Sequence, residues 1–117
     1  MRARWPRLGV ATVRGRSMEP TLHEGDRLLV LYGAAPRPGR MAVVQLPSSA
    51  DGPRPLAVKR VVGRSQAHPD HWWVERDNPR EGIDSWHVGP IPGEGIRARV
   101  LFRLPDRRRN GGKHGVG

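Results

Sequence analysis

The sequence lacks cysteine entirely, which excludes disulfide bonds, thiolate nucleophiles and cysteine metal sites. It also lacks any run of about 18 apolar residues, the length that a helix needs to cross a membrane. Lysine is rare, since 19 of the 21 Lys and Arg residues are arginine and the two lysines are Lys59 and Lys113. Covalent catalysis in this chain would therefore rely on hydroxyl groups, and any lysine inside an apolar segment stands out.

Glycine and proline are plentiful, with 15 and 12 residues, and they favour turns between short strands over long helices. A length of 117 residues is typical of one domain. We therefore predict a mainly β fold, with a single small catalytic-type domain over residues 1–105. The glycine-rich basic stretch 106–117 offers nothing to pack and is expected to be a disordered tail.

Six segments carry the apolar and β-branched pattern of strands: 8–13, 27–32, 41–46, 56–62, 71–75 and 96–104. In the last of these, apolar side chains occupy every second position from Ile96 to Leu104, and Arg97, Arg99 and Arg103 lie between them. This alternation predicts one buried face that is made of Ile96, Ala98, Val100, Phe102 and Leu104. Residues 81–89 are predicted to form a polar loop or a short turn.

The net charge of +10 suggests a basic nucleic-acid-binding domain as one reading. The arginines are spread along the chain, however, and are not gathered in one stretch, so no nucleic-acid partner is expected. Three histidines, His68, His71 and His87, match no metal-ligand spacing, so no metal and no cofactor are expected either.

Ser17 stands on a constrained turn between two predicted strands. Gly15 permits a close approach or a positive φ, and Pro20 restricts the backbone just after the serine. A serine held in this way is a usual place for a nucleophile, although most such serines only complete a turn. The hydroxyl needs a base to become reactive.

Lys59 supplies a candidate base from the predicted strand 56–62. Alternation of side chains places Lys59 on one face with Ala57 and Val61, and Arg60 on the opposite face. Lysine is rarely buried, and an apolar site lowers its pKa and favours the neutral amine. Ser17 and Lys59 together therefore predict a Ser-Lys catalytic dyad.

The blocks around these residues resemble type I signal peptidases, in the same order and over roughly residues 13–102: Gly15-Arg-Ser17-Met-Glu-Pro-Thr-Leu22, Gly25-Asp26, Val58-Lys59-Arg60-Val-Val-Gly63 and Asp77-Asn78…Asp84-Ser85…Gly89-Pro90. The resemblance implies the β catalytic core that signal peptidases share with SOS-repressor proteases. It implies Ser17 as nucleophile, Lys59 as general base and an oxyanion hole that includes the Ser17 N–H. The residues expected to brace this site are Arg60, Asp77, Asn78, Asp84 and Ser85.

Four positions depart from the family pattern. Many members have a serine hydroxyl at the position of Gly15, so here the oxyanion hole is expected to use backbone N–H groups alone. Arg76 stands where the family has a glycine. Gly82 stands where the family has a serine that orients the lysine. Trp86 stands where the family has an arginine that pairs with the aspartate at the position of Asp84. Arg60 and Arg80 are the candidates for that missing cation. Gly82→Ser and Trp86→Arg are expected to preserve or raise activity.

The short chain, in which no apolar anchor is evident, more closely resembles the nickel-type superoxide dismutase maturation proteases. These remove an N-terminal propeptide from the dismutase precursor, and the nickel belongs to that substrate. The resemblance implies a cytoplasmic serine endopeptidase with a protein precursor as partner. The alternative is a general type I signal peptidase that cleaves secretory preproteins, with membrane association through an anchor outside this sequence. SOS-repressor proteases add a DNA-binding domain, for which no room is expected before Ser17.

Overall fold

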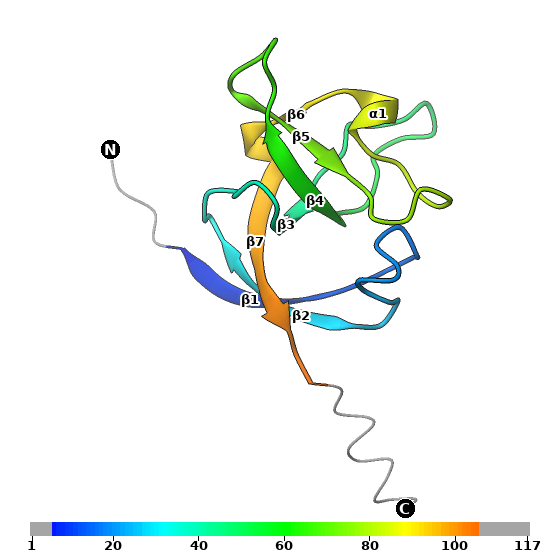
Figure 1. Ribbon diagram of the computed structural model, residues 1–117, viewed down its shortest axis with the longest axis vertical. Coiled ribbons are helices and arrows are strands. Elements are labelled where there is room, and N and C mark those ends of the chain that lie inside the picture. The colour runs from blue at the N-terminus through cyan, green and yellow to red at the C-terminus, as the bar shows by residue number, and fades with distance from the viewer. Residues whose placement is uncertain (1–5, 106–117) are drawn as a thin grey trace, which may run out of the picture.

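The computed structural model describes residues 6–105, so the predicted disordered tail 106–117 lies outside the described residues. Nearly all regular structure is antiparallel sheet, which confirms the mainly β fold (Figure 1). The strands are β1 (Arg7–Thr12), β2 (Arg27–Tyr32), β3 (Met41–Val44), β4 (Ala57–Arg64), β5 (His71–Glu75), β6 (Ile91–Pro92) and β7 (Ile96–Arg103). They form one sheet in the order β1-β2-β7-β3-β4-β5-β6. Within residues 6–105 no helix is long and apolar enough to cross a membrane.

The predicted strands all form, with small differences at their ends. The two-residue strand β6, the single-turn helix α1 (Ser85–Val88) and the 3-10 turn Gly93–Gly95 were not predicted. All three are too short to produce a periodic pattern. Helix α1 instead begins at a capping box, in which the Asp84 side chain accepts from the backbone N–H of Trp86. The segment 81–89, predicted as a polar loop or a short turn, thus contains one helical turn in its second half.

The sheet curls around two apolar clusters. One lies between β2, β7 and the turn that follows β1, and its members are Val13, Met18, Leu22, Leu28, Val30, Val43, Ala98 and Val100. The other lies over β3, β4, β5 and β6, with Ala42, Val44, Leu46, Val61, Trp72, Val74, Ile91 and Ile96. Figure 1 shows β7 running from the half of the fold that contains β6 to the half that contains β1 and β2. The strand thus joins both clusters and fixes the two halves of the sheet to each other.

The predicted buried face of β7 is correct only for its first half. Ile96, Ala98 and Val100 are buried, but Phe102 is 55% exposed. The register between β2 and β7 shifts at Leu29/Val30, so that Phe102 pairs with Leu29 while Val100 pairs with Val30. One extra residue in a strand turns the following side chains to the other face, and a sequence pattern does not show where such a bulge occurs.

Candidate active site

Ser17 lies on the turn that connects β1 to β2, and apolar anchors hold this turn. Met18 and Leu22 are 1% and 3% exposed and pack into the first cluster. The Leu22 N–H donates to the Met18 carbonyl at 2.9 Å, and the Val13 N–H donates to the Asp26 carbonyl at 2.8 Å. Burial of Met18 and Leu22 thus anchors the turn and leaves Ser17 itself half-buried at the surface.

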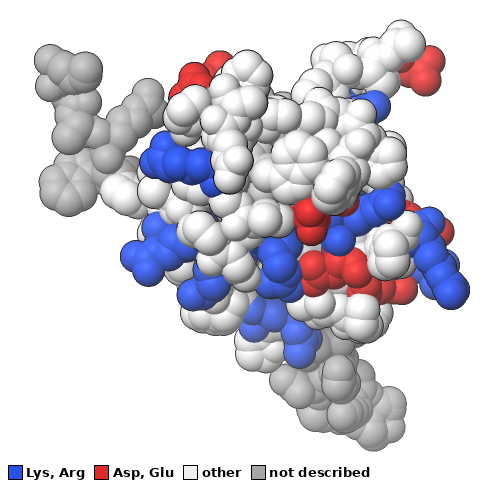
Figure 2. Space-filling view, turned by 45° about the horizontal axis from the view of Figure 1, so that its top comes forward, with Lys and Arg blue, Asp and Glu red and all other residues white. Residues whose placement is uncertain are grey.

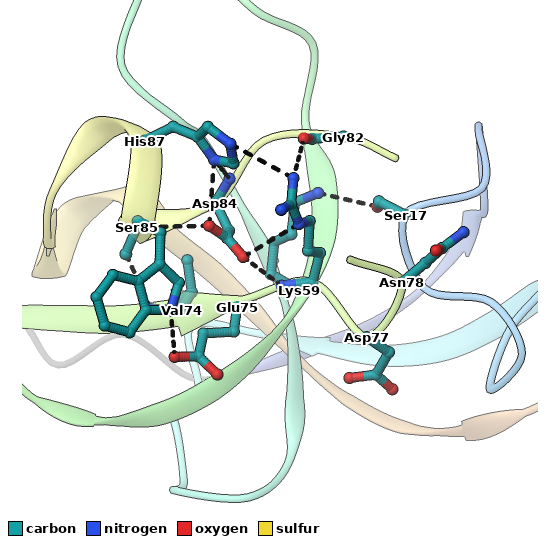
Figure 3. Close-up of polar contacts among 12 residues, drawn as sticks. Ser17, Lys59, Val74, Glu75, Asp77, Asn78, Gly82, Asp84, Ser85 and His87 are labelled. Atoms are coloured by element: carbon teal, nitrogen blue, oxygen red, sulfur yellow. Dashed lines mark hydrogen bonds and ion pairs between the residues drawn. The ribbon is translucent and has the colours of Figure 1, made fainter. Parts of the chain in front are cut away.

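Lys59 projects from the middle of β4 toward Ser17. Its side chain is 3% exposed, and Val61 on the same face is fully buried, whereas Val62 on the other face is 48% exposed. The alternation predicted for this strand is therefore correct. The Nζ atom of Lys59 lies 2.9 Å from the Oγ atom of Ser17, within hydrogen-bonding distance (Figure 3).

Burial changes the acidity of the lysine. Removal from water disfavours the ammonium form and is the main cause that lowers the pKa of Lys59 from 10.5 to about 8. The carboxylate of Asp84 opposes this shift and raises the pKa, while the guanidinium of Arg76 lowers it further. A substantial fraction of neutral amine is then present slightly above neutral pH, next to a hydroxyl group.

Asp77 and Asn78 connect the serine turn to the lysine strand. Asp77 accepts hydrogen bonds from Thr21 Oγ1 at 2.6 Å and from Arg60 Nε and Nη2 at 2.9 and 2.6 Å. The bonds from Arg60 are the main reason that the pKa of Asp77 lies below its ordinary value. Asn78 donates from its backbone to the Ser17 carbonyl at 2.8 Å and from Nδ2 to the Arg16 carbonyl at 2.9 Å. The segment 77–78 therefore fixes the position of the serine relative to β4.

Asp84 and Ser85 occupy the buried start of helix α1. Their exposed fractions are 2% and 1%. The Oγ of Ser85 accepts from the backbone N–H of Val74 at 3.0 Å and so holds the helix against β5 (Figure 3). All five residues expected to brace the site thus lie on the segments that surround Ser17 and Lys59.

The cation next to Asp84 is Arg76, one of the four positions that depart from the signal-peptidase pattern. The Nε atom of Arg76 lies 3.6 Å from Asp84 Oδ2. Neither expected substitute has this role, since Arg60 pairs with Asp77 and the backbone N–H of Arg80 donates to Asn78 Oδ1. The expectation for Arg60 and Arg80 is therefore wrong. One signal was available: an arginine appears at position 76 in the same chain that lacks one at position 86.

Gly82 lies directly against Ser17 and Lys59, and the space around it argues against the expectation that Gly82→Ser preserves activity. A Cβ atom added to Gly82 would be 2.6 Å from Ser17 Cβ and 3.5 Å from Lys59 Nζ. The residue also has φ +88°, a conformation that glycine adopts readily and other residues do not. The absence of a side chain at this position is what lets segment 81–83 approach Ser17.

We therefore expect Gly82→Ser to reduce kcat/KM by about 100-fold or more, because a shift of about 1 Å in a reacting group has an effect of this size. Gly89→Ser is the matched control, since Gly89 has φ +83° but nothing within 4 Å of an added Cβ. Both substitutions place a serine at a positive φ, so both should lower stability to a similar extent. Only Gly82→Ser should also lower the activity of the folded protein. Equal activity of the two variants would contradict the close approach.

The backbone around Ser17 offers donors for a developing oxyanion. Within residues 6–105 the N–H of Ser17 makes no hydrogen bond, so it is free to donate to a ligand. Gly15 has φ +78° and open space around its α-carbon. As a glycine, it contributes no side-chain donor to the site. The expected oxyanion hole of backbone groups alone is compatible with this geometry.

Ser17 lines two adjoining pockets. A pocket of about 220 Å³ lies between the end of β1 and the start of β4, with an apolar lining that includes Ala11, Val13, Val43 and Val58. A second pocket of about 460 Å³ continues past Lys59 and Gly82, with several arginines at its rim. Among residues 6–105 no group of three or more His, Asp or Glu side chains gathers as metal ligands would.

Residues 4–83, more than half of the chain, match the Peptidase S24-like family. The chain belongs to this family. Subunit 1 of the mitochondrial inner membrane protease from Mus musculus is 30% identical over 82% of this chain and 69% of its own length. The Homo sapiens protein of the same name is 29% identical over the same shares. The protein is accordingly a peptidase of the signal-peptidase-like kind, and its substrate is a protein.

Proposed function

We propose that this S24-like peptidase cleaves its substrate with a Ser17–Lys59 dyad. The observation that carries the proposal is the 2.9 Å distance between Lys59 Nζ and Ser17 Oγ, with the lysine almost fully buried. Hydrogen bonds from Asn78 hold the serine turn in that position. A buried amine beside a hydroxyl group on a braced turn is the arrangement that activates a serine without histidine.

In the proposed mechanism the neutral amine of Lys59 accepts the Ser17 hydroxyl proton as Oγ bonds to the scissile carbonyl carbon. The carbonyl π electrons move to oxygen, and the Ser17 N–H donates to the resulting oxyanion. When the tetrahedral intermediate collapses, the C–N bond breaks and the lysine ammonium gives its proton to the leaving amine. Lys59, neutral again, takes a proton from water as the water oxygen bonds to the acyl carbon of the ester. When this second tetrahedral intermediate collapses, the C–Oγ bond breaks and the Lys59 ammonium returns the proton to Ser17 Oγ, which releases the carboxyl product and restores the dyad.

The substrate is proposed to bind as an extended strand across this cleft. β1 is the edge strand of the sheet, and the 220 Å³ pocket lies between its end and residues 56–58. An exposed strand edge offers main-chain N–H and C=O groups to an extended peptide. The apolar lining favours a small apolar side chain before the cleaved bond.

We propose that the precursor is that of nickel superoxide dismutase, whose N-terminal propeptide is removed in the cytoplasm. The resemblance to the maturation proteases supports this substrate. A specific observation favours a second candidate, a preprotein at a membrane, because the curated relatives are named as subunits of an inner membrane protease. Nucleic-acid binding has less support, since Figure 2 shows basic side chains in separate groups interleaved with acidic ones and no continuous basic stripe on that face.

The test is to incubate the purified protein separately with the dismutase precursor and with a secretory preprotein in lipid vesicles. The mass and N-terminus of each product are then determined, with the Ser17→Ala variant as control. A single cut at the end of the propeptide, absent with Ser17→Ala, is expected. Cleavage of the preprotein alone would transfer the substrate assignment to the second candidate.

A further inference from the structure

Asp84 is a buried carboxylate whose charge must be compensated. It is 2% exposed, and its Oδ1 accepts from the Trp86 N–H at 3.0 Å while Oδ2 accepts from the Arg76 N–H at 3.0 Å. Within residues 6–105 the only Lys or Arg side chain within 4 Å of this carboxylate is Arg76, at 3.6 Å. His87 Nδ1 lies 3.3 Å from Oδ1. A carboxylate removed from water is costly without such partners.

The same guanidinium also fixes the wall of the cleft. Arg76 Nη1 donates to the Gly82 carbonyl at 2.6 Å, and Gly82 is the residue that touches Ser17. The Arg76 side chain is 19% exposed, so it lies mostly inside the protein. One arginine thus connects the end of β5 to both Gly82 and Asp84.

The Trp86 side chain lies against β5 and makes no side-chain contact with Asp84. Its indole packs edge-on against Trp73 at 5.1 Å, and its Nε1 donates to Glu75 at 2.9 Å. Its ring is therefore engaged with the Trp73–Glu75 side of β5, and only its backbone contacts Asp84. The two departures from the signal-peptidase pattern, arginine at 76 and tryptophan at 86, complement each other in space.

We propose that Arg76 is a positioning residue for the Lys59 base, in which its guanidinium replaces the arginine missing at position 86 and holds Asp84 and Gly82 beside the lysine. This inference rests on the proposed dyad. The charged groups that act on the lysine are Asp84 before α1 and Arg76 after β5, and the imidazole of His87 on α1 lies against Asp84. The pocket that contains Lys59 is further lined by Glu81, Arg14, Arg16 and Arg54. Removing Arg76 deletes a positive charge and leaves the Asp84 charge uncompensated, and both changes favour the lysine ammonium.

The test is an NMR titration of lysine side chains in protein labelled with ¹³C-lysine, which needs no substrate. The chain has two lysines, so Lys113→Arg assigns the signals. Wild-type Lys59 is expected to titrate at about 8. Arg76→Gln should raise this pKa by about one unit, the size of an effect from one nearby charge. The turnover at pH 7 should then fall about tenfold, because the neutral fraction of the lysine falls by that factor.

Arg76→Lys keeps the charge and should leave the Lys59 pKa within about 0.3 units of wild type, a fraction of the full charge effect. Arg37→Gln, at an exposed loop position, is the matched control and should change neither value. An unshifted Lys59 pKa in folded Arg76→Gln would overturn the proposal even if activity fell. If Arg76→Gln does not fold, a one-unit shift in Arg76→Lys would overturn it instead. Loss of the dyad assignment would appear separately, as cleavage by Ser17→Ala.

Discussion

Ser17→Ala is expected to lower kcat/KM by at least about four orders of magnitude, the effect that removal of a catalytic serine has in known serine peptidases. The hydroxyl is the only part of the side chain that faces Lys59, so its loss removes the bond-forming atom and leaves the site otherwise unchanged. The fold should persist, because the anchors of this turn are Met18, Leu22 and backbone hydrogen bonds. Cleavage rates and the thermal unfolding midpoint are the two measurements.

Ser49→Ala provides a matched control for this loss. Ser49 lies in the loop between β3 and β4, where its Oγ donates to the Gly52 carbonyl at 3.3 Å. The same atoms are removed there without touching the cleft, so activity should stay within about twofold of wild type, as for most surface changes. Cleavage by Ser17→Ala at a rate close to that of Ser49→Ala would show that another group attacks the peptide bond.

Lys59→Arg is expected to reduce turnover by about 100-fold to 10,000-fold, the usual contribution of a general base. The substitution keeps a positive charge at the end of a long side chain, but a guanidinium does not lose its proton at any working pH. It therefore separates a role as base from a role as cation. Turnover of Lys59→Arg similar to wild type would exclude Lys59 as the base.

Lys59→Met tests how the buried lysine affects the free energy of unfolding. A methionine fills similar space beside Val61 and needs no hydrogen-bond partner. Because burial lowers the lysine pKa, keeping the ammonium form inside the protein costs stability below about pH 8. Lys59→Met should therefore be at least as stable as wild type at pH 7 while lacking activity, which a denaturant titration and a cleavage assay would show.

The two residues of the proposed dyad could be singled out from sequence because each stands in a strong local pattern. Ser17 stands between Gly15 and Pro20, two residues that constrain the backbone of a turn, and Lys59 interrupts an apolar strand in an arginine-rich chain. Alternation along one strand decides which face a side chain takes. The sequence therefore indicated both the strand that carries the lysine and the face on which it lies.

The partners of Asp84 could not be predicted in the same way, because they depend on how distant segments meet. Arg76 reaches Asp84 and Gly82 only because β5 and helix α1 are packed together through Ser85. Gly82 was compared with a serine by position alone, whereas the available space depends on the approach of Ser17 from another segment. The bulge opposite Leu29, which exposes Phe102, is another consequence of pairing between strands.

The most direct test of the dyad is the pH dependence of kcat/KM for the wild-type protein, measured between about pH 6 and pH 10 with whichever precursor it cleaves. Since the neutral amine is the active form, the rate should rise with pH through an apparent pKa of about 8 and then level off. The inflection should coincide with the pKa of Lys59 measured by NMR. A rate that does not change with pH across this range would contradict a neutral Lys59 as the base that activates Ser17.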